Sequence, residues 1–197
     1  MKTIKNSISR ITALAGLILV STSTLLAQKS GVFKSYADFQ TGTMEYEINC
    51  TTEKHKIRLN DFLGKDFLTV VHDGRPYDIK KAETWGYQLC DEKLVRFQGT
   101  DHFPLEDKGI LWIYTKQTVQ TVSRGGSKTV KTYYFSKGGN GTIALLTLLN
   151  LKSAFQDDHK LHDVIDSQFK SDASLKEFDQ YYKKFRINHF LESQEVK

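Results

Sequence analysis

Apolar and polar residues alternate along much of the chain between residues 44 and 135, a pattern typical of half-buried β-strands. The alternation is clearest in residues 83–99, where two short strands flank an acidic turn at Asp91 and Glu92. A second hairpin is indicated by the apolar run 67–71, because it is followed by the strong turn-forming pair Asp73-Gly74. These stretches predict a β-rich region over roughly half of the chain.

Further strands are predicted on both sides of these hairpins, at residues 44–48, 57–59, 77–79, 110–114, 118–122 and 129–135. Together the segments amount to roughly eight strands with short connections, which favour antiparallel neighbours. A roll or a partly open barrel would bury the aromatic face of such a meander.

The pattern changes to helical spacing after the glycine cluster at residues 138–141. Apolar residues recur every three or four positions in three stretches, within 148–155, 161–169 and 175–185, and each set forms one helical stripe. We expect Thr147 to cap the first helix and Ser171 or Asp172 to cap the third, which would extend into the segment around Phe190. Strands about 44–135 followed by about three helices over 145–194 predict an α+β fold.

Before this β-rich region, the segment 31–42 reads GVFKSYADFQTG. Ser35 stands three residues before Asp38, which is the arrangement of a capping box, and it predicts a short helix around residues 36–40.

Residues 1–27 have the three parts of a secretory signal: early basic residues, the apolar run 11–20 and a small and polar stretch that ends at Ala27. The alternative is a membrane anchor, but the apolar run is shorter than the roughly 20 residues that a span requires. We therefore expect cleavage near Ala27, a secreted or periplasmic location and no transmembrane span in the mature chain. The remaining 28–197, about 170 residues, suit a single domain.

Charge changes this picture in one respect. The chain has 28 basic and 23 acidic side chains, and residues 1–27 hold three of the basic ones, so the expected mature chain carries 25 against 23, or +2. The charges read as interspersed, without the basic stripe that nucleic-acid binding requires. Nucleic acid is therefore not an expected partner.

Two cysteines, Cys50 and Cys90, remain in the expected mature chain. An even number in an oxidising compartment favours a disulfide, which would close a loop of about 40 residues and stabilise the fold by about 4 kcal/mol. The alternative is a pair of buried free thiols, because spacing alone does not establish connectivity.

The opening segment 31–42, together with WGYQLC at residues 85–90, resembles a group of exported bacterial proteins of unknown function. The shared features are a Gly-aromatic opening, an Asp-Phe pair and a Trp-Gly-aromatic strand. The resemblance implies a bacterial envelope or extracellular setting. It implies no activity and no site residues.

The densest polar cluster lies in the second predicted helix, where His159, His162, Asp163 and Asp166 would share one face at spacings of three and four residues. Imidazole and carboxylate on one face are able to bind a metal ion. The competing interpretation is a solvated helix face whose acidic residues complement the helix dipole.

Four aromatic residues, Trp85, Tyr87, Trp112 and Tyr114, form a candidate platform for a sugar or a peptide. Aromatic residues at alternating strand positions are more often core, and we expect Trp85 to be mostly buried.

Catalytic signatures are absent from the sequence: there is no G-x-S-x-G elbow and no papain-like cysteine context. The four other histidines are scattered singly, at His55, His72, His102 and His189. A hydrolase site assembled only in the fold stays open.

The sequence thus predicts an exported, non-catalytic binding domain of a bacterial envelope. Its partner would be a protein, a glycan or an envelope component, and no cofactor is indicated. The alternatives are a metal-binding protein that uses His159, His162 and Asp163, and a hydrolase.

Overall fold

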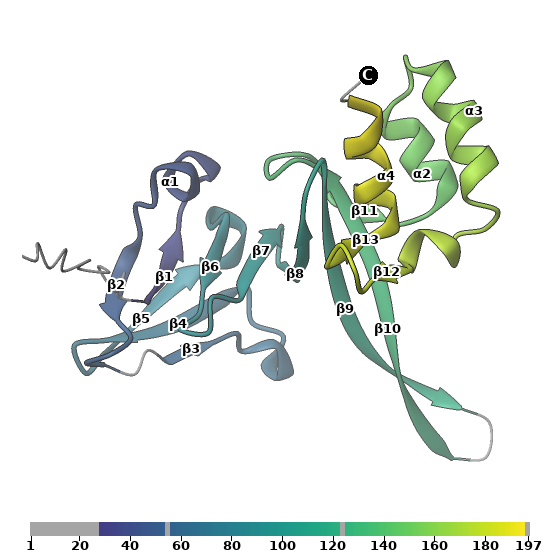
Figure 1. Ribbon diagram of the computed structural model, residues 1–197. Coiled ribbons are helices and arrows are strands. Elements are labelled where there is room, and N and C mark those ends of the chain that lie inside the picture. The colour runs from purple at the N-terminus through teal and green to yellow at the C-terminus, as the bar shows by residue number, and fades with distance from the viewer. Residues whose placement is uncertain (1–27, 54–55, 123–124, 196–197) are drawn as a thin grey trace, which may run out of the picture.

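The computed structural model describes residues 28–53, 56–122 and 125–195, so the expected signal peptide lies outside the described residues. The chain folds as an α+β protein in which an eight-stranded antiparallel sheet is followed by C-terminal helices (Figure 1). The predicted fold class is confirmed.

The eight-stranded sheet is open, because its strand order β11-β10-β9-β8-β7-β6-β1-β2 leaves β2 and β11 at separate edges. Consecutive strands pair as neighbours from β6 to β11, as expected for short connections. The strands are β1 Lys29–Phe33, β2 Glu45–Asn49, β6 Gly86–Gln88, β7 Leu94–Gln98, β8 Asp101–Lys108, β9 Leu111–Val122, β10 Gly126–Lys137 and β11 Ala144–Leu145.

A three-stranded sheet covers one face of the β1, β6 and β7 region (Figure 1). It consists of β3 Lys56–Arg58, β4 Phe67–His72 and β5 Arg75–Lys80, and the Asp73-Gly74 turn joins the last two strands. Both turn residues have positive φ, at 49° and 74°, which is the tight hairpin turn that this pair favours. Buried residues from both sheets form one core: Val32, Leu68, Val70, Ile79, Tyr87, Val95 and Phe97.

Three helices pack beside β9, β10 and β11: α2 Leu148–Ala154, α3 His159–Gln168 and α4 Arg186–Glu195. The predicted cap of the first helix is confirmed, since Thr147 Oγ1 accepts from Asn150 N, and α3 has a cap that was not predicted, Asp158, whose Oδ1 accepts from Leu161 N. Their apolar stripes meet the sheet in a second core of Leu111, Ile113, Phe135, Leu146, Leu151, Ile165, Phe169, Leu175, Phe185, Ile187 and Leu191.

The predicted capping box begins a short helix, α1 Tyr36–Thr41, that covers part of the sheet near its centre. Ser35 Oγ accepts from Asp38 N, and the Asp38 carboxylate accepts from Ser35 N at 2.8 Å. The helix lays Tyr36 and Phe39 on the rings of Trp85 and Trp112. A third core thus lies under α1.

Three strands of the main sheet were not predicted: β1, β8 and the two-residue strand β11. Pro104 lies within β8, opposite Val95, and proline argues against a central strand. It is tolerated here beside an irregularity in the β8–β9 register between Leu105 and Asp107. In addition, the two strands predicted at 110–114 and 118–122 are one long strand, β9.

The prediction of a helix over residues 175–185 is wrong. This segment forms a short 3-10 helix, η3 Ser174–Lys176, and a hairpin of β12 Phe178–Asp179 and β13 Lys184–Phe185. The Asp179 carboxylate accepts from the backbone N–H groups of Tyr181 and Tyr182, which fixes a turn in place of a helix. The third helix begins only at Arg186, and Asp172 accepts from Leu148 N at the start of α2 instead.

Candidate functional site

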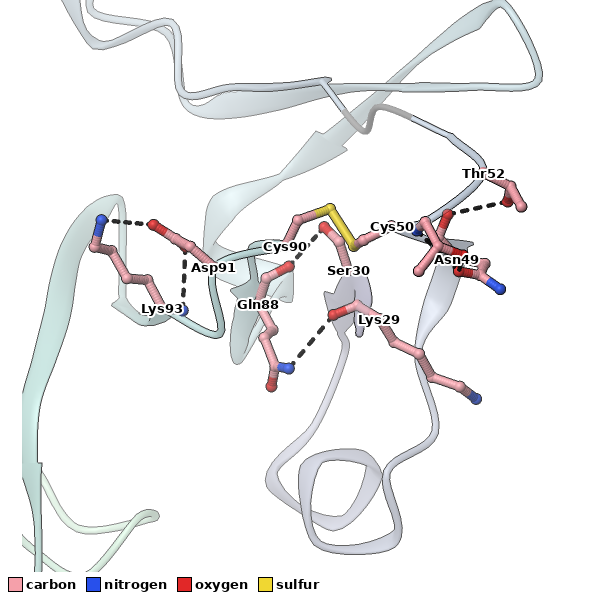
Figure 2. Close-up of a disulfide and its surroundings, with 10 residues drawn as sticks. Lys29, Ser30, Asn49, Cys50, Thr52, Gln88, Cys90, Asp91 and Lys93 are labelled. Carbon is pink, nitrogen blue, oxygen red and sulfur yellow. Dashed lines mark hydrogen bonds and ion pairs between the residues drawn. A yellow bond between two sulfur atoms is a disulfide. The ribbon is translucent and has the colours of Figure 1, made fainter. Parts of the chain in front are cut away.

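The predicted disulfide between Cys50 and Cys90 is present, with Cα atoms 5.6 Å apart (Figure 2). The two cysteines lie just beyond the ends of β2 and β6, the strands on either side of β1. Figure 2 shows Ser30 of β1 beside the bond, where its hydroxyl donates to Gln88 O. The bond therefore holds together the two strands that enclose β1.

The predicted aromatic platform does not exist as an exposed surface. Trp85, Tyr87, Trp112 and Tyr114 are all buried, and Tyr87 belongs to a different core from the other three. The reason is that α1 and the three-stranded sheet cover both faces of the sheet at this point. The expectation that Trp85 is mostly buried is confirmed, at 8% exposure.

The candidate metal ligands on α3 do not converge. The Nε2 atom of His162 lies 3.0 Å from Lys152 O and 2.9 Å from Phe155 O, so it donates to the end of α2. The Asp166 carboxylate pairs with the Lys152 ammonium. His159 and Asp163 are exposed.

Across the described part of the chain, no three His, Cys, Asp or Glu side chains gather so as to hold a metal ion. The structure instead uses His162 and Asp166 to fasten α3 to α2.

A polar cleft of about 460 Å³ lies where three distant segments meet: the loop 61–66, the start of β8 and the middle of β9. Its charged and titratable lining consists of Asp61, Lys65, Asp66, Lys81, Asp101, His102 and Lys116. β8 and β9 diverge here, because their pairing ends at Leu105 and Tyr114. The cleft thus follows from the sheet topology.

An ion pair between a buried lysine and an exposed aspartate lines the cleft. The ammonium group of Lys81, which is 2% exposed, donates to the Asp61 carboxylate at 2.7 Å and to Lys65 O at 2.8 Å. A buried ammonium requires such partners. The pair therefore fixes the loop 61–66 against the short 3-10 helix η2 Lys81–Glu83 that follows β5.

The other carboxylate oxygen of Asp61 lies 3.3 Å from Nδ1 of His102. Burial lowers the pKa of His102 below its ordinary value of 6.5, and the positive charges of Lys116 and Lys81 act in the same direction, while Asp61 opposes them. His102 is therefore neutral at pH 7. A neutral imidazole beside a carboxylate is the arrangement that general bases use.

Elsewhere in the lining the Lys116 ammonium binds the Asp101 carboxylate, while Lys65 and Asp66 take part in none of the ion pairs among the described residues. Among the described residues that line the cleft there is no serine and no cysteine. The cleft is thus lined by charged and polar groups that are able to bind a polar ligand.

Sequence reasoning missed this cleft because its members are far apart along the chain. His102 was counted among the scattered histidines; of the others, His55 lies outside the described residues. A lysine at position 81 gives no local sign that it is buried. Only the pairing of β7 with β8 brings residues 101 and 102 near the loop 61–66.

No helix among the described residues is long and apolar enough to cross a membrane. Comparisons of the chain with models of protein families, with curated proteins and with solved structures find no match.

Proposed function

We propose that this chain is an exported, non-catalytic binding domain of a bacterial cell envelope. Its contact surface is the polar cleft together with the ribbon, which we define as residues 115–121 of β9 and 126–133 of β10. The observation that carries this proposal is that the ribbon extends beyond its neighbouring strands beside the cleft.

The ribbon projects from the body of the molecule (Figure 1). β9 and β10 pair along their whole length. β8 pairs with β9 only as far as Tyr114, and β11 pairs with β10 only at Tyr134 and Phe135. No described strand pairs with the outer edges beyond these points. Val119 is 72% exposed. Free strand edges accept an extended partner segment as an added strand.

Charge supports an acidic partner. The expectation of interspersed charge fails here, because residues 108–156 contain seven basic side chains and no acidic one. Lys116 and Lys131 pair with Asp101 and Glu106, while Lys128 has no ion-pair partner among the described residues. Like charge disfavours pairing between two ribbons, and it attracts a negatively charged protein, glycan or envelope component.

The disulfide supports the proposed location, because such bonds persist in compartments outside the cytoplasm. Signal-peptide cleavage near Ala27 and the bacterial setting are part of the same proposal. Mass spectrometry of exported protein would show a chain beginning at Gln28.

Site-specific photocrosslinking tests the contact surface. With a benzophenone amino acid at Thr129, illumination in an envelope extract of the producing bacterium is expected to give a discrete adduct. The double variant Lys128→Glu, Lys131→Glu should lower its yield several-fold, because two positive charges become negative. The same probe at Lys160, exposed on α3, is the matched control. Equal labelling at both positions, or no adduct at Thr129, would count against the proposal.

A second candidate function, hydrolysis by general base catalysis, is favoured by the contact between His102 and Asp61. In this mechanism water attacks the carbonyl carbon of an ester while Nε2 of His102 takes a proton from the water. The tetrahedral intermediate then breaks its bond to the alcohol or phenol oxygen, which leaves and takes up the proton. The Asp61 carboxylate holds the imidazole in the required tautomer. The polar cleft would receive the substrate.

The hydrolase candidate predicts that activity against a p-nitrophenyl ester falls 10²- to 10⁴-fold, in order of magnitude, in His102→Gln. Activity should rise with pH, with a midpoint below 6.5, because the base acts when deprotonated and its pKa is lowered. His159→Gln, on exposed α3, is the control. Wild-type activity no higher than buffer, or unchanged activity in His102→Gln, would reject this candidate.

A further inference from the structure

Among the residues that the structure describes, two cationic side chains are buried, Lys81 and Arg96, and only Lys81 has an anionic partner there. Lys81 has the Asp61 carboxylate at 2.7 Å. Arg96 on β7 is 6% exposed, yet it takes part in none of the ion pairs among the described residues. A buried charge without a counter-charge is strongly unfavourable. Arg96 therefore calls for an explanation.

Neutral groups satisfy only part of the Arg96 guanidinium. Nη1 lies 3.2 Å from both Tyr114 Oη and Ser136 Oγ, and Ser136 Oγ in turn lies 2.6 Å from Gly138 O. The ring of Trp85 is 6.0 Å away, at the limit of a cation–π contact. The Nε atom is buried and has no hydrogen-bond partner.

The described part of the chain has no group that neutralises this charge. A guanidinium stays protonated in proteins. Ionised Tyr114 would be a suitable counter-charge, but burial raises the pKa of its phenol, and this outweighs the opposing effects of Ser136 and Arg96. Tyr114 is therefore neutral at pH 7, and the hydrogen-bond network ends at a backbone carbonyl.

A glycine-rich loop covers this region. The indole N–H of Trp85 donates to Gly139 O at 3.1 Å, and Gly138 has a φ of 66°, which favours glycine. A side chain at position 139 would clash, because its Cβ would lie 2.4 Å from Cε2 of Tyr36. Gly138 and Gly139 thus lie on the aromatic cluster beside Arg96 and present backbone to it.

We propose that Arg96 is the receptor for a small monovalent anion, either chloride or the carboxylate group of a small ligand, bound at its unpartnered Nε–H. The anion gives Arg96 a negatively charged partner, as the Asp61 carboxylate does for Lys81. The buried Nε–H provides a free donor for it. The site is separate from the cleft and the ribbon and does not depend on their proposed function.

Anion-dependent stability tests this site in the full mature chain. Unfolding by urea is measured in sodium chloride, sodium acetate and sodium gluconate at constant ionic strength, with gluconate as the bulky reference anion. A ligand that binds only the folded state lowers the unfolding constant about tenfold per tenfold rise in its concentration above Kd. We expect this dependence for chloride or acetate in the wild type and its loss in Arg96→Met.

Two further measurements make the outcome decisive. Lys81→Met, which removes the other buried cation, should keep the anion dependence even if its stability is lower. Line broadening of ³⁵Cl in NMR should appear with wild type, and acetate should suppress it if carboxylate occupies the same site. If Arg96→Met does not fold, Arg96→Lys should retain a weakened dependence. An equal dependence in wild type and Arg96→Met, or none in wild type, would overturn the proposal.

Discussion

Trp85→Ala is expected to lower the free energy of unfolding by about 3–5 kcal/mol, the range for truncating a large aromatic residue in a core. The Trp85 side chain contacts the rings of Phe33, Tyr36, Phe39 and Trp112, and its indole N–H donates to Gly139 O. Alanine leaves a cavity among these rings and an unsatisfied carbonyl. Since domains are stable by only about 5–15 kcal/mol, this is a large fraction of the total.

The measurement is urea unfolding followed by far-ultraviolet circular dichroism. Tryptophan fluorescence is not a matched signal here, because Trp112 is the sole remaining tryptophan in the variant. Trp85→Phe should lose less stability, since a ring still fills most of the site. Tyr181→Ala is the matched control: its ring is exposed, and surface substitutions usually stay within about 0.5 kcal/mol. A loss in Trp85→Ala as small as that in Tyr181→Ala would show that the aromatic core is not as described.

Removing the disulfide is expected to cost about 4 kcal/mol of stability, on the chain-entropy estimate for a loop of about 40 residues. The bond restricts the unfolded chain, and in the folded state it holds the ends of β2 and β6 around β1. The double variant Cys50→Ser, Cys90→Ser should therefore unfold at a lower urea concentration. Amide hydrogen exchange at Ser30 and its neighbours should become faster, because local opening becomes easier.

Reductant provides the control for this prediction. Dithiothreitol should destabilise the wild type to about the level of the double variant and leave the variant unchanged. Mass spectrometry under non-reducing conditions should show the wild type two hydrogens lighter than its reduced form. Equal stability of wild type and double variant would contradict the predicted contribution of the bond.

Local signals predicted much of the fold correctly. The Asp73-Gly74 turn, the Ser35–Asp38 capping box and the hairpin at residues 83–99 each depend on residues a few positions apart, and each forms as expected. The hairpin is not half-buried as its alternation predicts, because residues 84–87 and 94–97 are buried on both faces. The pairing of Cys50 with Cys90 followed from having only two cysteines in an expected exported chain. These features need no knowledge of distant contacts.

Where local sequence patterns gave a wrong prediction, contacts between residues far apart in the sequence determined the structure. The stripe at residues 175–185 has helical spacing, yet Phe178 and Tyr182 remain partly exposed while Leu175 and Phe185 are buried in the helical core. Asn188 then fixes the start of α4 by bonding to the backbone N–H and C=O of Leu111 on β9. Periodicity alone carries no information about such a partner, 77 residues away.

The main features of the fold follow from local sequence patterns, whereas the candidate sites depend on contacts between distant residues. The sequence by itself determined the α+β class, the main hairpins, the capping of α1 and the expectation that Trp85 is buried, because these depend on turn chemistry and on the period of apolar residues. Only the tertiary structure decided that both faces of the sheet are covered around Trp85 and Tyr87, that Asp61 lies between Lys81 and His102, and that Arg96 is buried without an ion-pair partner among the described residues. Burial and electrostatic pairing depend on which strands become neighbours, and that is set by the free energy of the whole fold.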